Sequence, residues 1–271
     1  MTLELREEPD YLFDQIISEY VEQRYLTSII IPAYNEEQRI GPFLKSITES
    51  FSGNTEIIVV FDGNDNTPEI VKSFGNRVKL IQFSKRLGKG GAIIEGFKQA
   101  KGEVVGFVDA DGAIPASEVK RLSSMVTDEN PCVIGSRWTR TSRIESSEPI
   151  LNVFAGRVFH YLVFLILGLK IKDTQCGIKF FHRSILNSLL KRITIKSRMI
   201  DVVLLFHVKL LKKNIREVGI RWKHVSGTKL PIMKIIPFMF ATLVGLRLVH
   251  SDFLRQKTNS IVRFQFDLRY K

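Results

Sequence analysis

Two aspartates, Asp109 and Asp111, are separated by one residue and end a short apolar segment. The segment 103–109 is rich in β-branched residues and follows Gly102, which predicts a buried strand. Side chains two positions apart in a strand point to the same side, so both carboxylates would face one point at the strand's C-terminal end. Such a pair suits Mg²⁺ or Mn²⁺, usually shared with phosphates. A solvated acidic turn is the alternative, and the surrounding elements argue against it.

The elements around this pair alternate between strands and helices. The apolar patterns predict strands at 28–31, 56–61, 78–83, 103–109 and 132–135, and helices at 36–50, 67–74, 90–100 and 115–127. Repeated β-α units with short connections indicate an α/β fold with a mostly parallel sheet covered by helices. In such sheets, ligands bind at the C-terminal ends of the strands. An amphipathic helix over 10–25 is expected before the sheet, and a polar, mobile loop over 138–150 after it.

The charge of the chain is unevenly placed. Residues 1–178 carry a net charge of −4, whereas residues 179–271 hold 20 Lys and Arg against 4 Asp and Glu, a net charge of +16. Nucleic acid and anionic lipid are both candidate partners for such a surface. Nucleic-acid binding is not expected, because the aromatic residues lie within the apolar runs 158–169 and 235–246 instead of alternating with basic residues.

The two apolar runs have two possible roles. Each is about 12 residues long, short of the roughly 20 residues that span a bilayer. Either run alone could be an ordinary core helix. Together, beside a basic surface, they favour helices that lie in a membrane interface.

Two turns between strands and helices carry further information. The first reads Ile31-Pro32-Ala33-Tyr34-Asn35-Glu36-Glu37 and lacks the pattern G-x-G-x-x-G, which argues against a dinucleotide-dependent dehydrogenase. The second, Gly88-Lys89-Gly90-Gly91, opens a predicted helix. Glycines at that position let backbone N–H groups approach an anion.

Taken together, these segments resemble the inverting family 2 glycosyltransferases with the GT-A fold. The matching segments are 31–37, 59–65, 88–90 and 109–111. Three more segments, 135–138, 173–179 and 222–229, are similar to the branch that contains the dolichyl-phosphate glucosyltransferases and mannosyltransferases. Asp173-Thr174-Gln175-Cys176-Gly177 is closer to the glucosyl enzymes. One departure is Phe61, which stands where the family usually has an aspartate.

The resemblance implies a role for each site residue. Those expected to bind the nucleotide-sugar are Pro32, Tyr34, Glu36, Asp62, Lys89 and Asp109. Asp109 and Asp111 would hold Mg²⁺ or Mn²⁺, and together with Arg137 they are the expected catalytic residues. Those expected to bind the acceptor phosphate are Arg137, Arg157, His224 and Lys229.

The resemblance also implies an activity and a location. The expected reaction is inverting transfer of a hexose, foremost glucose from UDP-glucose, to a dolichyl or polyprenyl phosphate, giving a lipid-linked sugar for glycan assembly. The alternatives are GDP-mannose as donor, or a sugar hydroxyl as acceptor. The expected organisation is a packing helix at 1–26, a GT-A domain at 27–230, and an amphipathic membrane-interface helix with a basic tail at 231–271. The protein would bind peripherally to the anionic cytoplasmic face of a membrane.

Overall fold

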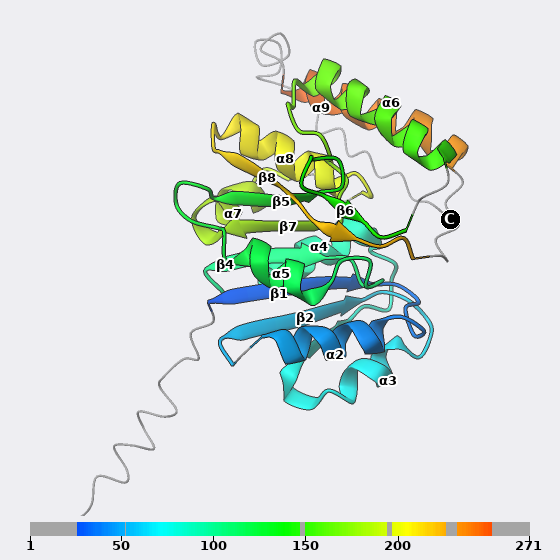
Figure 1. Cartoon of the computed structure of the whole chain (residues 1–271), viewed down its shortest axis with the longest axis vertical. Coiled ribbons are helices and arrows are strands. Elements are labelled where there is room, and N and C mark those ends of the chain that lie inside the picture. Colours follow the sequence, from blue (N-terminus) through cyan, green and yellow to red (C-terminus); the bar gives the residue numbers. More distant parts are fainter. Residues whose placement is uncertain (1–25, 52, 147–149, 194–196, 226–231, 251–271) are drawn as a thin grey trace, which may run out of the picture.

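The sheet is the centre of the structure. The computed structural model describes residues 26–51, 53–146, 150–193, 197–225 and 232–250 (Figure 1). The predicted helix over 10–25, the basic tail after residue 250 and Lys229 lie outside the described residues. Seven strands pair in the order β3-β2-β1-β4-β7-β5-β8. They are β1 (Thr27–Ala33), β2 (Thr55–Phe61), β3 (Lys79–Gln82), β4 (Val104–Val108), β5 (Cys132–Ser136), β7 (Ile178–His182) and β8 (Ile215–Gly219).

Helices cover both faces of this sheet, as the alternation of strands and helices predicts. They are α2 (Ile40–Ser50), α3 (Thr67–Lys72), α4 (Gly88–Gln99), α5 (Ala116–Ser123), α6 (Ile150–Leu167), α7 (Arg183–Leu190), α8 (Ile200–Leu210) and α9 (Ile232–Val249), with a short 3₁₀ turn at Gly75–Arg77. The α/β class is therefore confirmed. The predicted strands and helices of residues 28–135 are all present, with ends shifted by a few residues.

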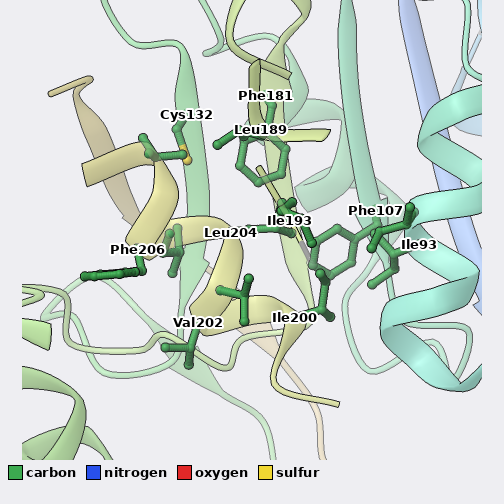
Figure 2. Close-up of a cluster of buried hydrophobic side chains, with 14 of the residues drawn as sticks. Ile93, Phe107, Cys132, Phe181, Leu189, Ile193, Ile200, Val202, Leu204 and Phe206 are labelled. Atoms are coloured by element: carbon green, nitrogen blue, oxygen red, sulfur yellow. The ribbon is translucent and has the colours of Figure 1, made fainter. Parts of the chain in front are cut away.

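Two apolar cores follow from the alternation of side chains along each strand. In β1, Ile29 and Ile31 face one core, which contains side chains of α2, α3 and α5. Ile30 faces the other, which contains side chains of α4, α6, α7, α8 and α9. Figure 2 shows part of this second core, with Phe107 of β4 and Phe181 of β7 near Leu204 of α8.

Strand β7 runs against the direction of its neighbours. It pairs antiparallel with both β4 and β5, whereas β1 pairs in parallel with β2 and β4, and β5 in parallel with β8. The N-terminal end of β7 therefore lies at the same edge of the sheet as the C-terminal end of β4. This brings the 173–177 segment to the edge at which Asp109 ends its strand.

The loop predicted over 138–150 is more ordered than expected, and the prediction of an irregular loop is wrong for part of it. Residues Arg143–Ile144 form strand β6, which pairs in parallel with β9 (Arg221–Trp222). The turn before β6 is closed by the Ser142 hydroxyl, which donates to the Ser136 carbonyl at 2.8 Å. The polar composition of this segment predicted a loop. Pairing with β9, which is distant in the sequence, forms a strand there instead.

Both apolar runs form helices, and each helix is longer than its run. α6 and α9 have 18 residues each and lie against one another at one end of the molecule (Figure 1). Among the described residues, no helix combines the length and apolar character needed to cross a bilayer. α6 is apolar on two sides: Phe159 and Val163 are buried, whereas Tyr161 and Leu165 are 63% and 73% exposed.

Candidate active site

Asp109 and Asp111 lie directly after β4, at the C-terminal edge of the sheet. The Asp109 N–H donates to the Gly177 carbonyl at 3.0 Å, which ties the end of β4 to the segment before β7. A β-carbon on Gly177 would overlap the Asp109 carboxylate, so glycine is needed for this close approach. The Asp111 carboxylate accepts from the Ala113 N–H at 3.0 Å, which fixes the turn after the strand.

Lys89, in the first turn of α4, faces Asp109. Its Nζ lies 2.8 Å from Asp109 Oδ1 and 3.3 Å from Asp201 Oδ2 on α8. Burial by itself would lower the pKa of Lys89, but the two carboxylates outweigh it and raise this pKa above its usual range. The predicted site residues Lys89 and Asp109 are thus brought together, with Asp201 as a third member that the site prediction did not include.

The carboxylates at this edge lie close enough to repel one another. Burial, and then the neighbouring Asp201 and Asp111, raise the pKa of Asp109 against the opposing effect of Lys89. Burial also raises the pKa of Glu36, which pairs with Arg39 at 2.7 Å and lies close enough to Asp111 and Asp109 to sense their charge. A divalent cation would relieve this repulsion, so the donor set fits Mg²⁺ or Mn²⁺.

The described side chains supply only part of a metal's coordination. In the part of the chain that the structure describes, no three His, Cys, Asp or Glu side chains are arranged to hold an ion. Asp109 and Asp111 would therefore share the cation with oxygen atoms from a substrate or water, as Mg²⁺ sites commonly do.

Asp62 organises the side of the site at which the nucleotide is expected. This buried carboxylate accepts from Arg86 Nη1 at 2.8 Å and from the backbone N–H groups of Leu87 and Gly88, each at 2.7 Å. It therefore caps the N-terminus of α4 from another element. The Arg86 guanidinium in turn lies over the Tyr34 ring, 3.1 Å from its centroid. Arg86 links two predicted site residues, and no pattern in the sequence marked it.

The remaining residues of this side follow from the first two strands. Ile30 is the last residue of β1 that pairs with β4. Pro32 lies two residues further along β1 and pairs only with β2, where its partner is Val60. Phe61, which replaces the usual aspartate, is 4% exposed and belongs to the core with α2. The Phe61 side chain therefore contributes to the packing of this core.

Arg137 follows β5 and is held by Asp173. Its Nε and Nη2 donate to the two Asp173 carboxylate oxygens at 2.8 and 3.0 Å, and its backbone N–H donates at 3.0 Å. Burial opposes ionisation of Asp173, but Arg137 outweighs it and lowers the pKa of this carboxyl. The Arg137 guanidinium also lies 5.5 Å from the centroid of the Trp222 ring. Asp173 thus fixes the orientation of the arginine predicted to contact the acceptor.

Two other predicted acceptor residues share aromatic neighbours, Trp138 and Trp222, with Arg137. Arg157 of α6 is exposed and its guanidinium lies 4.7 Å from the centroid of the Trp138 ring. His224 follows β9, its N–H donates to Ser146 Oγ at 2.7 Å, and its ring lies 6.0 Å from that of Trp222. A small pocket opens between α6 and the segment before β7, and the residues that line it are Arg137, Trp138, Gly156, Phe159, His160, Asp173, Thr174 and Gln175.

Comparison with known proteins decides the family. The model of glycosyl transferase family 2 matches residues 28–190. This chain belongs to glycosyl transferase family 2. The dolichyl-phosphate β-glucosyltransferase of Drosophila melanogaster is 32% identical over 223 residues, which cover 75% of this chain and 68% of that protein. The enzyme of the same name from Saccharomyces cerevisiae is 30% identical over 255 residues, covering 84% and 76%.

Solved structures confirm the GT-A fold of this transferase. Glucosyl-3-phosphoglycerate synthase from Mycobacterium tuberculosis, in complex with Mn²⁺, UDP and glucosyl-3-phosphoglycerate, superposes with a TM-score of 0.64. The two chains are 18% identical, and the match covers 92% of this chain and 88% of that one. At this identity the likeness establishes the fold of the transferase.

Proposed function

We propose that this transferase moves glucose from UDP-glucose to dolichyl phosphate and inverts the anomeric carbon. One observation carries the proposal: the Asp109/Asp111 pair lies at the C-terminal edge of β4, in a family 2 chain about 30% identical to dolichyl-phosphate β-glucosyltransferases. The GT-A neighbour crystallised with Mn²⁺ and UDP supports a divalent metal in this transferase.

The donor would occupy the edge formed by β1, β2 and β4. Tyr34 and Arg86 present a stacked ring and guanidinium beside which a base can lie. The predicted contact between Asp62 and the base would use Oδ1, which accepts one hydrogen bond, whereas Oδ2 already accepts two. Lys89 is placed to approach the diphosphate, since it lies 2.8 Å from Asp109.

The metal would be held by Asp109 and Asp111 and would stabilise the charge that develops on the leaving nucleoside diphosphate. An oxygen of the acceptor phosphate forms a bond to the anomeric carbon, and the bond from that carbon to the β-phosphate oxygen breaks, so that UDP leaves with the electron pair. The acceptor phosphate is already anionic at neutral pH, so no base has to remove a proton from it. What it needs is orientation, for which Arg137, fixed by Asp173, and the exposed Arg157 are placed.

The acceptor's lipid chain gives the exposed apolar residues of α6 and α9 a partner. Val158, Tyr161 and Leu165 of α6 share one face at helical spacing and are 45–73% exposed, and Phe240 of α9 is 48% exposed. Exposed cations border this surface at Arg157, Lys170 and Arg247. We propose that the helix pair lies in the cytoplasmic leaflet, where the apolar face is buried and the cations meet anionic headgroups.

Product analysis tests the activity directly. The purified chain is incubated in detergent with dolichyl phosphate, MnCl₂ and either UDP-glucose or GDP-mannose, and the lipid product is identified by mass. We expect a hexosyl phosphate lipid from UDP-glucose and its loss when EDTA is added. Dolichol without phosphate is the matched control acceptor, and a product from it would indicate transfer to a hydroxyl. Product from GDP-mannose alone would overturn the donor assignment.

A further inference from the structure

Four charged side chains of alternating sign run from the candidate metal site into the core. Asp109 contacts Lys89 at 2.8 Å, Lys89 contacts Asp201 at 3.3 Å, and Asp201 contacts Lys179 of β7 at 2.6 Å. Side-chain exposure falls along this chain from 37% at Asp109 and 23% at Lys89 to 5% at Asp201 and 0% at Lys179. The outer pair belongs to the active site, whereas the inner pair is out of reach of any substrate.

The inner pair lies in apolar surroundings. The ammonium groups of Lys89 and Lys179 lie 5.6 and 5.5 Å from the centroid of the Phe107 ring. Figure 2 shows Phe107 facing Ile93 and Ile200, the residue before Asp201. Removing charges from water is costly, and apolar replacements of buried ion pairs are often as stable as the pair. The stability of the core therefore does not explain why Lys179 and Asp201 are charged.

Lys89 and a divalent cation need the same carboxylate. The ammonium lies against both Asp109 oxygens, at 2.8 and 3.1 Å, so a cation that binds Asp109 competes with it for these oxygens. Asp201 already lies 3.3 Å from that ammonium. Its own position is fixed, because Lys179 binds it from behind and the same Lys179 Nζ donates to the Cys176 carbonyl at 2.7 Å.

We propose that Asp201 is a positioning residue that takes over the Lys89 ammonium when a divalent cation binds Asp109. This inference rests on the proposed function in one respect, the metal role of Asp109. Lys89 is then a counter-ion shared by two carboxylates: it neutralises Asp109 before the cation arrives and moves toward Asp201 afterwards. Lys179 holds Asp201 in place.

The proposal predicts opposite effects from two neighbouring substitutions. Asp201→Asn leaves Lys89 with Asp109 as its only carboxylate, so Mn²⁺ must compete harder, and its apparent affinity should fall by about tenfold, the effect of losing one close charge. Lys89→Met removes the competitor, so Mn²⁺ affinity should rise. In the Lys89→Met background, Asp201→Asn should change the affinity little, because its effect passes through Lys89.

The experiment measures Mn²⁺ binding in the presence of saturating UDP. The electron paramagnetic resonance signal of free Mn²⁺ gives the affinity for wild type, both single variants and the double variant, without any turnover. Lys98→Met is the matched control, because Lys98 lies on the same helix in an exposed pair with Glu95 at 2.9 Å. We expect wild-type affinity from this control.

An equal loss in both backgrounds would overturn the inference, because Asp201 would then act on the cation directly or only support the fold. If Asp201→Asn does not fold, Lys179→Met replaces it. That variant removes the side chain that holds Asp201 in place, so it should weaken Mn²⁺ binding in the wild-type background and change it little in the Lys89→Met background, whereas mere damage to the core would weaken it in both and contradict the inference. A wild-type chain that binds UDP but no Mn²⁺ would remove the metal site itself. The sugar donor and lipid acceptor are tested separately by product analysis.

Discussion

The two ends of the sheet handle exposure in opposite ways. At the edge formed by β1, β2 and β4, most side chains that define the site are charged and paired, as in Asp62 with Arg86 and Asp109 with Lys89. Beyond β8, the helices α6 and α9 expose apolar side chains such as Leu165 and Phe240. This difference fits the proposed roles, a soluble, highly charged ligand at the first region and an apolar surface at the second.

The reversed strand β7 joins these two regions. Because β7 is antiparallel to β4, the segment that precedes it returns to the edge where β4 ends, and the Gly177 carbonyl accepts from Asp109. The same segment carries Asp173, which holds Arg137 on the side of α6. A chain segment of a few residues thus contacts the candidate metal site with one end and the candidate acceptor site with the other.

The largest effect should come from removing the charge at the first region. Asp109→Ala should reduce transfer by about 10²–10³-fold, since stabilisation of a leaving diphosphate by a metal amounts to several kcal/mol. The measurement is the transfer rate at saturating Mn²⁺, with circular dichroism to verify folding. Asp128→Ala is the control, because its side chain is 88% exposed and far from the edge in sequence. Near-wild-type turnover of Asp109→Ala in EDTA would refute the metal role.

A smaller, more selective effect is expected from the second region. Leu165→Asp places a charge in the most exposed apolar position of α6 and should weaken binding to anionic vesicles without changing UDP binding. Vesicle flotation at low and high salt measures it, because salt screens the headgroup attraction and leaves the apolar part. Leu26→Asp is matched in type and is 54% exposed at the start of β1. Equal loss from both variants would mean that the α6 surface is not the docking surface.

The sequence predicted these two regions unequally. The strands and helices of residues 28–135 were predicted because each follows a local pattern, and Asp109 and Asp111 were predicted from their spacing at the end of one of these strands. α2 starts at Ile40, four residues later than predicted, because the Arg39 and Ile40 N–H groups both donate to the Glu36 carbonyl and close a turn first. The pairing of β6 with β9 and the reversal of β7 depend on contacts between distant segments, which no local pattern encodes.

The site was predicted in the same uneven way. Asp62 and Lys89 were predicted from their characteristic neighbourhoods, whereas their partners Arg86 and Asp201 were not. Arg86 has no pattern around it, and its role follows only from its 2.8 Å pair with Asp62. Arg198 is similar. Burial, and then Arg86, lower the pKa of Arg198, whereas Asp109 raises it, so a second arginine lies near the carboxylates. Asp201 was not predicted, because its contacts with Lys89 and Lys179 depend on the fold.

The smallest effect concerns a buried histidine between α8 and α9. The charged edge has no such group among its described contacts, so this effect would distinguish the two regions. His207 is 2% exposed, its Nδ1 lies 2.8 Å from the Val203 carbonyl, and no described residue meets its Nε2. Burial, then the facing His250 and Arg192, lower the pKa of His207 below 6.5, against the carbonyl bond, which raises it. The unfolded chain therefore binds this proton more readily than the folded one.

Stability should be complete above pH 6.5 and fall as the pH drops toward the folded pKa of His207, by at most about 1.4 kcal/mol per pH unit for one proton. Thermal unfolding between pH 7.5 and 5.5 measures this slope, and His207→Gln should flatten it. A slope unchanged by the substitution would assign the acid sensitivity to other groups and leave the contact of α9 with α8 independent of pH.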